Sequence, residues 1–273
     1  MKAGKKRTLI TAATTLVLAL VGVTAARADE RLNDKDVKAL MQRIHDERDR
    51  FEDQLDGNVK HKVLRGPAGE VDVEKFLDDL QDNVDKMKGR YKDDYAAGSE
   101  VATVLRQASA VQRFMSAQPP NIKGGSEWTR LAGSLNDLAV AYGTTFPTPD
   151  DATVRRIGDH EIADAASKMA DAADQFRKRL DDALKLETHI PQASREAAVA
   201  EANGLKKDAD ELAERLNDHK PASGEATALL QRAGRIESTA MKLSLPSSAT
   251  DAWKSVLPPL ATIAHGFNLT PLH

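Results

Sequence analysis

The sequence predicts an all-α protein that consists of two tandem up-down four-helix bundles related by internal duplication. Three observations predict this fold. Glycine and proline interrupt the chain sparsely, with 16 glycines and 11 prolines in 273 residues. Between these breaks, apolar residues recur at the three- and four-residue spacing of one helix face. The second half of the chain then repeats the pattern of the first half at a distance of 125 residues.

The first 28 residues have the features of a secretory signal peptide. A basic start at 2–7 precedes an apolar run at 9–25, and the Ala-Arg-Ala stretch at 26–28 fits the small-x-small rule for cleavage. We therefore expect cleavage between Ala28 and Asp29 and a periplasmic or secreted mature protein. An uncleaved anchor is the alternative, because the run of 17 residues is at the lower limit for a membrane span.

Charge and cysteine content exclude several classes of function. The segment 1–28 holds five of the 39 basic residues and none of the 42 acidic ones, so the mature chain carries a net charge of −8. A polyanion such as DNA or RNA is not an expected partner, because phosphate binding requires a basic surface. The absence of cysteine excludes a lipoprotein anchor, disulfides, thiolate metal sites and c-type haem attachment.

Four apolar stripes predict the helices of a first bundle, which we assign to residues 29–147. Short polar breaks separate the stripes at 65–70, around Gly98 with Ser99 as a helix N-cap, and at 118–125, where two prolines end a helix. Short connections make neighbouring helices antiparallel. The stripes consist of Val37, Met41, Ile44, Phe51 and Leu55; Leu77, Leu80, Val84, Met87 and Tyr91; Val101, Val104, Ala108, Val111 and Met115; and Trp128, Leu131, Leu135, Leu138 and Tyr142. No stretch alternates with period two for long enough to predict a strand.

The second bundle, which we assign to residues 148–273, is predicted by superposing the chain on itself. Moving the segment 34–142 onto 159–267 without a gap gives 19 identities in 109 positions. Chance would give roughly one in fifteen in a chain of this composition. The segment 144–151, with two prolines, is the expected connection between the copies. The second copy is richer in alanine and carries Pro258 and Pro259 in its last helix, which we expect to start near Asp251 and to break after Val256.

No motif in the sequence predicts catalysis or a bound cofactor. A di-metal bundle would need Glu-x-x-His motifs, and none occurs. The stretch His160–Asp164 begins like a zinc-protease helix, but Asp164 stands where the second histidine would be, so a polar helix start is the simpler interpretation. The chain has neither a Gly-x-Ser-x-Gly elbow nor a Gly-rich phosphate loop. We therefore predict no catalytic, cofactor or metal site, with a carboxylate-based enzyme as the remote alternative.

Three large side chains are candidates for special roles. Arg48 interrupts the first stripe where the second copy has Ala173. Its stem could lie along the helix seam with its head in water, or it could form a buried ion pair or a contact in the groove between the bundles. Trp128 and Trp253 occupy matched positions, which predicts core anchors; ligand stacking is the alternative.

The core pattern resembles an uncharacterised family of exported bacterial all-helical proteins with a tandem four-helix repeat. The resemblance covers both repeats, although the second lacks the Asp-Leu pair of the first. It implies the fold and no activity. The residues that carry it are Arg50, Phe51, Trp128, Leu131, Leu135, Asp137, Leu138, Ala139 and Tyr142.

These observations favour a non-enzymatic exported protein that acts as an envelope scaffold, adaptor or binding module. Another envelope protein is the candidate partner, and the groove between the two bundles is the expected binding surface. The alternative is a small-molecule or metal carrier with its site inside one bundle, entered where Pro258 opens the second bundle. No membrane span is expected after signal cleavage.

Overall fold

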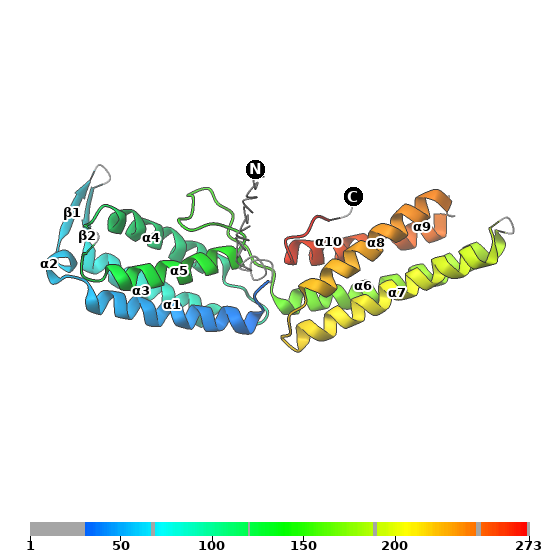
Figure 1. Ribbon diagram of the computed structural model, residues 1–273, viewed down its shortest axis with the longest axis horizontal. Helices are drawn as coiled ribbons and strands as arrows, with labels where there is room; N and C mark the ends of the chain where they lie inside the picture. Colours follow the sequence, from blue (N-terminus) through cyan, green and yellow to red (C-terminus); the bar gives the residue numbers. More distant parts are fainter. Residues whose placement is uncertain (1–30, 67–68, 120, 188–189, 244–246, 272–273) are drawn as a thin grey trace, which may run out of the picture.

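A computed structural model describes residues 31–66, 69–119, 121–187, 190–243 and 247–271 (Figure 1). The predicted cleavage site between Ala28 and Asp29 lies outside these residues. The described chain is predominantly helical, which confirms the predicted all-α class. Its apolar side chains form two separate cores, one in each half. Within the described ranges, no helix is long and apolar enough to cross a membrane.

The N-terminal bundle consists of α1 (Asp34–Gln54), α3 (Val73–Arg90), α4 (Gly98–Ser116) and α5 (Gly125–Ala141). The helices pack in a ring, α1 on α3, α3 on α4, α4 on α5 and α5 on α1. The four predicted stripes all point into this ring, where Ile44, Leu105 and Leu138 are fully buried. Helical periodicity therefore identified each long helix of this half.

The connection between α1 and α3 contradicts the expectation that no strand is present. It contains a short helix, α2 (Gly57–Lys60), and two antiparallel strands, β1 (Val63–Gly66) and β2 (Gly69–Asp72). Each strand has four residues, which is too short for an alternating pattern to stand out in the sequence. The hairpin lies at the end of the bundle (Figure 1).

The expected N-cap at Ser99 is also wrong. Helix α4 begins one residue earlier, at Gly98, after Ala97 in a left-handed conformation with φ of 47°. The Ser99 hydroxyl donates to the Glu100 carboxylate instead. Tertiary packing decides this start, because a Cβ atom on Gly98 would lie 3.2 Å from the carbonyl oxygen of Val154.

The C-terminal bundle consists of α6 (Asp159–Leu186), α7 (Gln192–Asn217), α8 (Ser223–Leu243), α9 (Ser247–Lys254) and α10 (Leu257–Gly266). Helix α6 packs on α7, α9 and α10, and α8 packs on α7 and α10. Seven alanines of α6 are buried, so neighbouring backbones can approach closely. The predicted break falls between α9 and α10, although α9 begins at Ser247 rather than near Asp251. Pro258 lies in the first turn of α10, where its missing N–H removes no helical hydrogen bond.

Residues 143–158, which we call the linker, connect α5 to α6 and pack against α4. The backbone N–H of Thr148 donates to the Ser109 hydroxyl at 2.8 Å, and both residues are buried. The backbone N–H of Arg155 donates to the carbonyl of Tyr142 at 3.1 Å. The linker is therefore part of the N-terminal half and delivers the start of α6 to the start of α1 (Figure 1).

Candidate functional site: the joint and groove between the bundles

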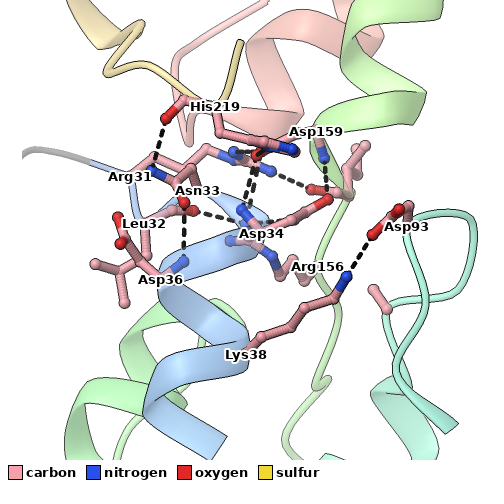
Figure 2. Close-up of polar contacts among 12 residues, drawn as sticks. Arg31, Leu32, Asn33, Asp34, Asp36, Lys38, Asp93, Arg156, Asp159 and His219 are labelled. Atoms are coloured by element: carbon pink, nitrogen blue, oxygen red, sulfur yellow. Dashed lines mark hydrogen bonds and ion pairs between the residues drawn. The ribbon is translucent and has the colours of Figure 1, made fainter. Parts of the chain in front are cut away.

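The two halves meet where α1 and α6 begin. Asp34 and Asp159 are the first residues of these helices and are 2% exposed each. The backbone N–H of Asp34 donates to the Asp159 carboxylate at 2.7 Å, and the N–H of Asp159 donates to the Asp34 carboxylate at 2.8 Å (Figure 2). Each carboxylate thus lies at the positive end of the other helix, where an anion stabilises the unpaired N–H groups.

Arg31 extends from the N-terminal half into the C-terminal half. Its guanidinium pairs with Asp159 and donates to the carbonyl of Ile157 at 2.5 Å. Its backbone N–H donates to the Ser223 hydroxyl at 3.4 Å, and its guanidinium lies 5.5 Å from the centre of the Phe267 ring. Burial is the main cause of the lowered pKa of Arg31, and the positive charge of the nearby Arg156 lowers this pKa further.

Arg156 makes the corresponding contacts from the linker to the start of α1. Its guanidinium donates to the Asp34 carboxylate at 2.8 Å and to the carbonyl of Leu32 at 2.6 Å. Arg31 and Arg156, like Asp34 and Asp159, are 125 residues apart. Apart from the bond between the Arg31 N–H and Ser223, each of these hydrogen bonds therefore has a reciprocal counterpart, as in an arrangement with two-fold symmetry.

Two further contacts break this symmetry. The Tyr91 hydroxyl donates to Asp34 at 2.9 Å, and burial raises the pKa of Tyr91 well above its usual range. On the other side, the His219 ring lies 3.8 Å from the Asp159 carboxylate.

We call the cluster of Arg31, Asp34, Arg156 and Asp159 the joint. Its two positive and two negative charges balance, and such a buried cluster loses about 3–5 kcal/mol when one partner is removed.

A groove of about 1620 Å³ opens beside the joint. Helices α1 and α5 form one wall, α8 and α10 form the other, and Arg31, Leu32 and Ile157 belong to the base. The remaining lining residues are Asp36, Ala39, Leu40, Arg43, Asp137, Val140, Ala141, Gly143, Thr153, Arg155, Arg156, Glu161, Ser223, Gly224, Thr227, Ala228, Gln231, Thr262, His265, Gly266, Phe267, Asn268 and Leu269. The groove expected between the bundles is therefore present in the structure.

The lining of the groove is chemically mixed. Val140 is 58% exposed there, beside the exposed cations Arg43 and Arg155 and the exposed acid Asp137. The groove is also larger than the roughly 300–1,000 Å³ of ordinary small-molecule sites. Size and mixed charge suit a polypeptide segment better than a small molecule or a polyanion.

Arg48 lies elsewhere. It is buried in the N-terminal bundle, 3% exposed, and its guanidinium pairs with Asp49 and with Glu52 on its own helix. It is not among the residues that line the groove. Three roles were considered for Arg48, and its geometry is that of a buried ion pair within α1. Its guanidinium contacts acids of its own helix rather than residues of the groove between the bundles.

The two tryptophans lie in the cores. The ring of Trp128 is 5.2 Å from that of Phe51 with an interplanar angle of 56°, and Trp253 is 5.0 Å from Phe176 with an angle of 58°. Trp128 donates from Nε1 to Gln112 at 2.8 Å, whereas the buried Nε1 of Trp253 has no partner among the described residues. Each indole fills a core, as tilted aromatic pairs do.

Metal sites receive no support from the described residues, in which no group of three or more His, Asp or Glu could hold a metal ion. His160 is exposed at the start of α6 and serves as a polar helix start, in agreement with the simpler interpretation of that motif.

The joint itself was missed in the sequence. Its signal is a repeated Arg-x-x-Asp, Arg31 to Asp34 and Arg156 to Asp159. The superposed segments begin at Asp34 and Asp159, three residues after the two arginines. A repeated pair of one cation and one anion at a helix start adds nothing to the helical periodicity of apolar residues. The apolar stripes therefore gave no reason to extend the superposed segment back to the arginines.

A scan against protein-family models, a search of the curated proteins and a search of the solved structures found no match to this chain.

Proposed function

We propose that this protein is a non-enzymatic binding module of the bacterial envelope that holds a segment of a partner protein in the groove between its two bundles. The observation that carries the proposal is the groove with walls from both halves, set beside a joint of reciprocal buried ion pairs. Such a joint fixes the angle between the walls, and a preformed groove avoids the cost of ordering on binding.

The proposal includes an origin by tandem duplication. Its support is that contacts as well as residues recur 125 positions apart. The Phe51–Trp128 pair recurs as Phe176–Trp253 with nearly the same distance and angle. The ion pair between Arg90 and Glu100 recurs as Arg215 and Glu225, and the pair between Arg31 and Asp159 has its reciprocal in Arg156 and Asp34.

The bundle interiors give less support to the alternative of a small-molecule carrier. Both cores are closely filled by apolar side chains. Exposed side chains of mixed chemistry, Arg43, Asp137, Val140 and Arg155, line the groove instead. A periplasmic or secreted location remains part of the proposal and rests on the segment 1–28.

Site-specific photo-crosslinking in the host envelope tests this proposal. A photo-reactive residue replaces Val140 in the groove in one variant, and Leu186, which is 82% exposed at the far end of α6, in the matched control. The expected result is a discrete crosslinked species from position 140 and none from position 186. Identical products from both positions, or no product from position 140, would reject the groove as the binding surface. N-terminal sequencing of the recovered chain should read from Asp29.

A further inference from the structure

The face of α8 that lines the groove is the counterpart of a face that the protein covers in its other half. On α4, the linker runs along one stripe. Thr148 binds Ser109 at 2.8 Å, and Val154 lies against Gly98, eleven residues earlier on α4. Ala102, between them, is only 8% exposed. A proline-containing segment with a turn at 150–151 thus lies antiparallel to α4 over about 16 Å of helix.

The corresponding stripe on α8 is open. The positions 125 residues later are Ser223, Thr227 and Gly234. Ser223 and Thr227 line the groove, and Thr227 is exposed where Ala102 is buried. Helix α4, all of which the structure describes, contributes no lining residue to the groove, whereas Thr153 and Arg155 of the linker do line it.

The two-fold relationship of the joint identifies what would cover α8. Arg156 lies near the end of the linker, and the residue 125 positions earlier is Arg31, so the chain ahead of Arg31 corresponds to the linker. One contact already joins this part of the chain to α8, since the backbone N–H of Arg31 donates to the Ser223 hydroxyl at 3.4 Å. Cleavage after Ala28 would leave two residues ahead of Arg31, which span about 7 Å when extended. That is too short to cover a stripe of about 16 Å.

We infer that the stripe Ser223–Gly234 of α8 is the docking site for a proline-containing segment of a partner protein, seated as the linker is seated on α4. This inference rests on the proposed function and names the chemistry of its partner. Proline suits such a segment, because its fixed φ restricts the free chain, which then loses less entropy on binding. The Ser223 and Thr227 hydroxyls and the Gln231 amide offer hydrogen bonds to its backbone.

The probe is a synthetic peptide with the linker sequence 144–155, TTFPTPDDATVR, added to the mature protein 29–273. Amide hydrogen exchange followed by mass spectrometry reports where it binds. Exchange across 223–234 should slow saturably, by about threefold when the free peptide is at twice its Kd. A peptide of the same composition in scrambled order should leave the exchange unchanged.

A pair of matched variants makes the test specific. Thr227→Trp fills the stripe and should abolish the protection. Thr129→Trp is the control, because Thr129 is also exposed and its hydroxyl also bonds to the carbonyl four residues earlier, but it lies outside the groove. Protection that persists in Thr227→Trp, or protection absent from 223–234 up to saturating peptide, would overturn the inference. Thermal unfolding of both variants verifies that they are folded.

The outcomes separate this inference from the function on which it rests. A crosslink from position 140 in the envelope, together with no peptide protection on α8, would keep the groove as the binding surface and reject the stripe on α8 as the docking site. Loss of the crosslink rejects the proposed function whatever the peptide does.

Discussion

Asp34 and Asp159 lie 125 residues apart, and each carboxylate accepts a hydrogen bond from the backbone N–H of the other, at 2.8 and 2.7 Å. Two helix starts, both positive, would repel each other without these carboxylates. The pair (Figure 2) therefore stabilises a head-to-head meeting of α1 and α6. This meeting brings the two walls of the groove together.

Substitution of Arg156 by methionine should be strongly destabilising. It removes the only guanidinium that binds Asp34 in the described structure and leaves that carboxylate buried, which costs about 3–5 kcal/mol of unfolding free energy. Urea titration measures the loss, and small-angle X-ray scattering should show a larger radius of gyration as the bundles separate. Arg90→Met is the control, since Arg90 also pairs with an acid but its side chain is 68% exposed. That change should cost less than about 1 kcal/mol, and equal losses in the two variants would refute the role of the joint.

Replacement of each tryptophan by phenylalanine should give unequal results. Both changes remove similar apolar area from matched positions. Only Trp128→Phe also breaks a hydrogen bond, that to Gln112, because the Trp253 Nε1 has no partner in the described residues. Trp128→Phe should therefore cost about 1 kcal/mol more than Trp253→Phe in urea titrations. An equal cost would show that the bond to Gln112 does not contribute.

Removal of the Ser109 hydroxyl should loosen the linker. In Ser109→Ala, the buried N–H of Thr148 loses its acceptor, at a cost of about 1–3 kcal/mol. Limited proteolysis should then cut faster between 144 and 152. Thr103→Ala is the matched control on the same helix, because that hydroxyl is exposed and bonds only within α4. Its effect should stay within about 0.5 kcal/mol, and equal cleavage of both variants would count against the tether.

Glu100 should contribute a pH-dependent part of the stability. Burial acts to raise the pKa of its carboxyl, but hydrogen bonds from Ser99, from its own backbone N–H, from Tyr95 and from Arg90 together lower it. A lowered pKa in the folded state stabilises the protein above the unfolded value of about 4.3, and this contribution is lost as the pH falls through the folded value. Wild type should thus exceed Glu100→Gln in unfolding free energy at pH 7, and the difference should shrink below about pH 4. A difference that is constant from pH 7 to pH 3 would contradict this assignment.

The long helices could be predicted from the sequence because each buries one stripe, and a stripe is a local pattern that survives substitutions. The break of the last helix could be predicted as well, because Pro258 cannot lie in a helix interior. The start of α4 could not, since it depends on the approach of Val154 to Gly98 from a segment more than fifty residues away.

The candidate site was predicted only in outline. A groove between two bundles follows from any tandem arrangement of bundles, whereas its composition depends on which faces the linker covers. The misplaced candidate, Arg48, shows the limit: an arginine in an apolar stripe is conspicuous in the sequence, but Glu52 one turn away is enough to pair it within its own helix. The repeated arginines of the joint were less conspicuous and proved to be the ones that link the halves.

The separation of the joint partners along the chain has a consequence for biosynthesis. Asp34 meets Arg156 across 122 residues, whereas all the helices that pack together in the N-terminal bundle lie within residues 34–141. Contacts of short sequence separation form first, and domains fold in the order in which they emerge. The N-terminal bundle can therefore pack while Asp34 still awaits its partner, and the second wall of the groove arrives only with α8 and α10. A chain that is cut short before α10 lacks that wall, so the complete groove is present only in molecules whose synthesis has passed both bundles.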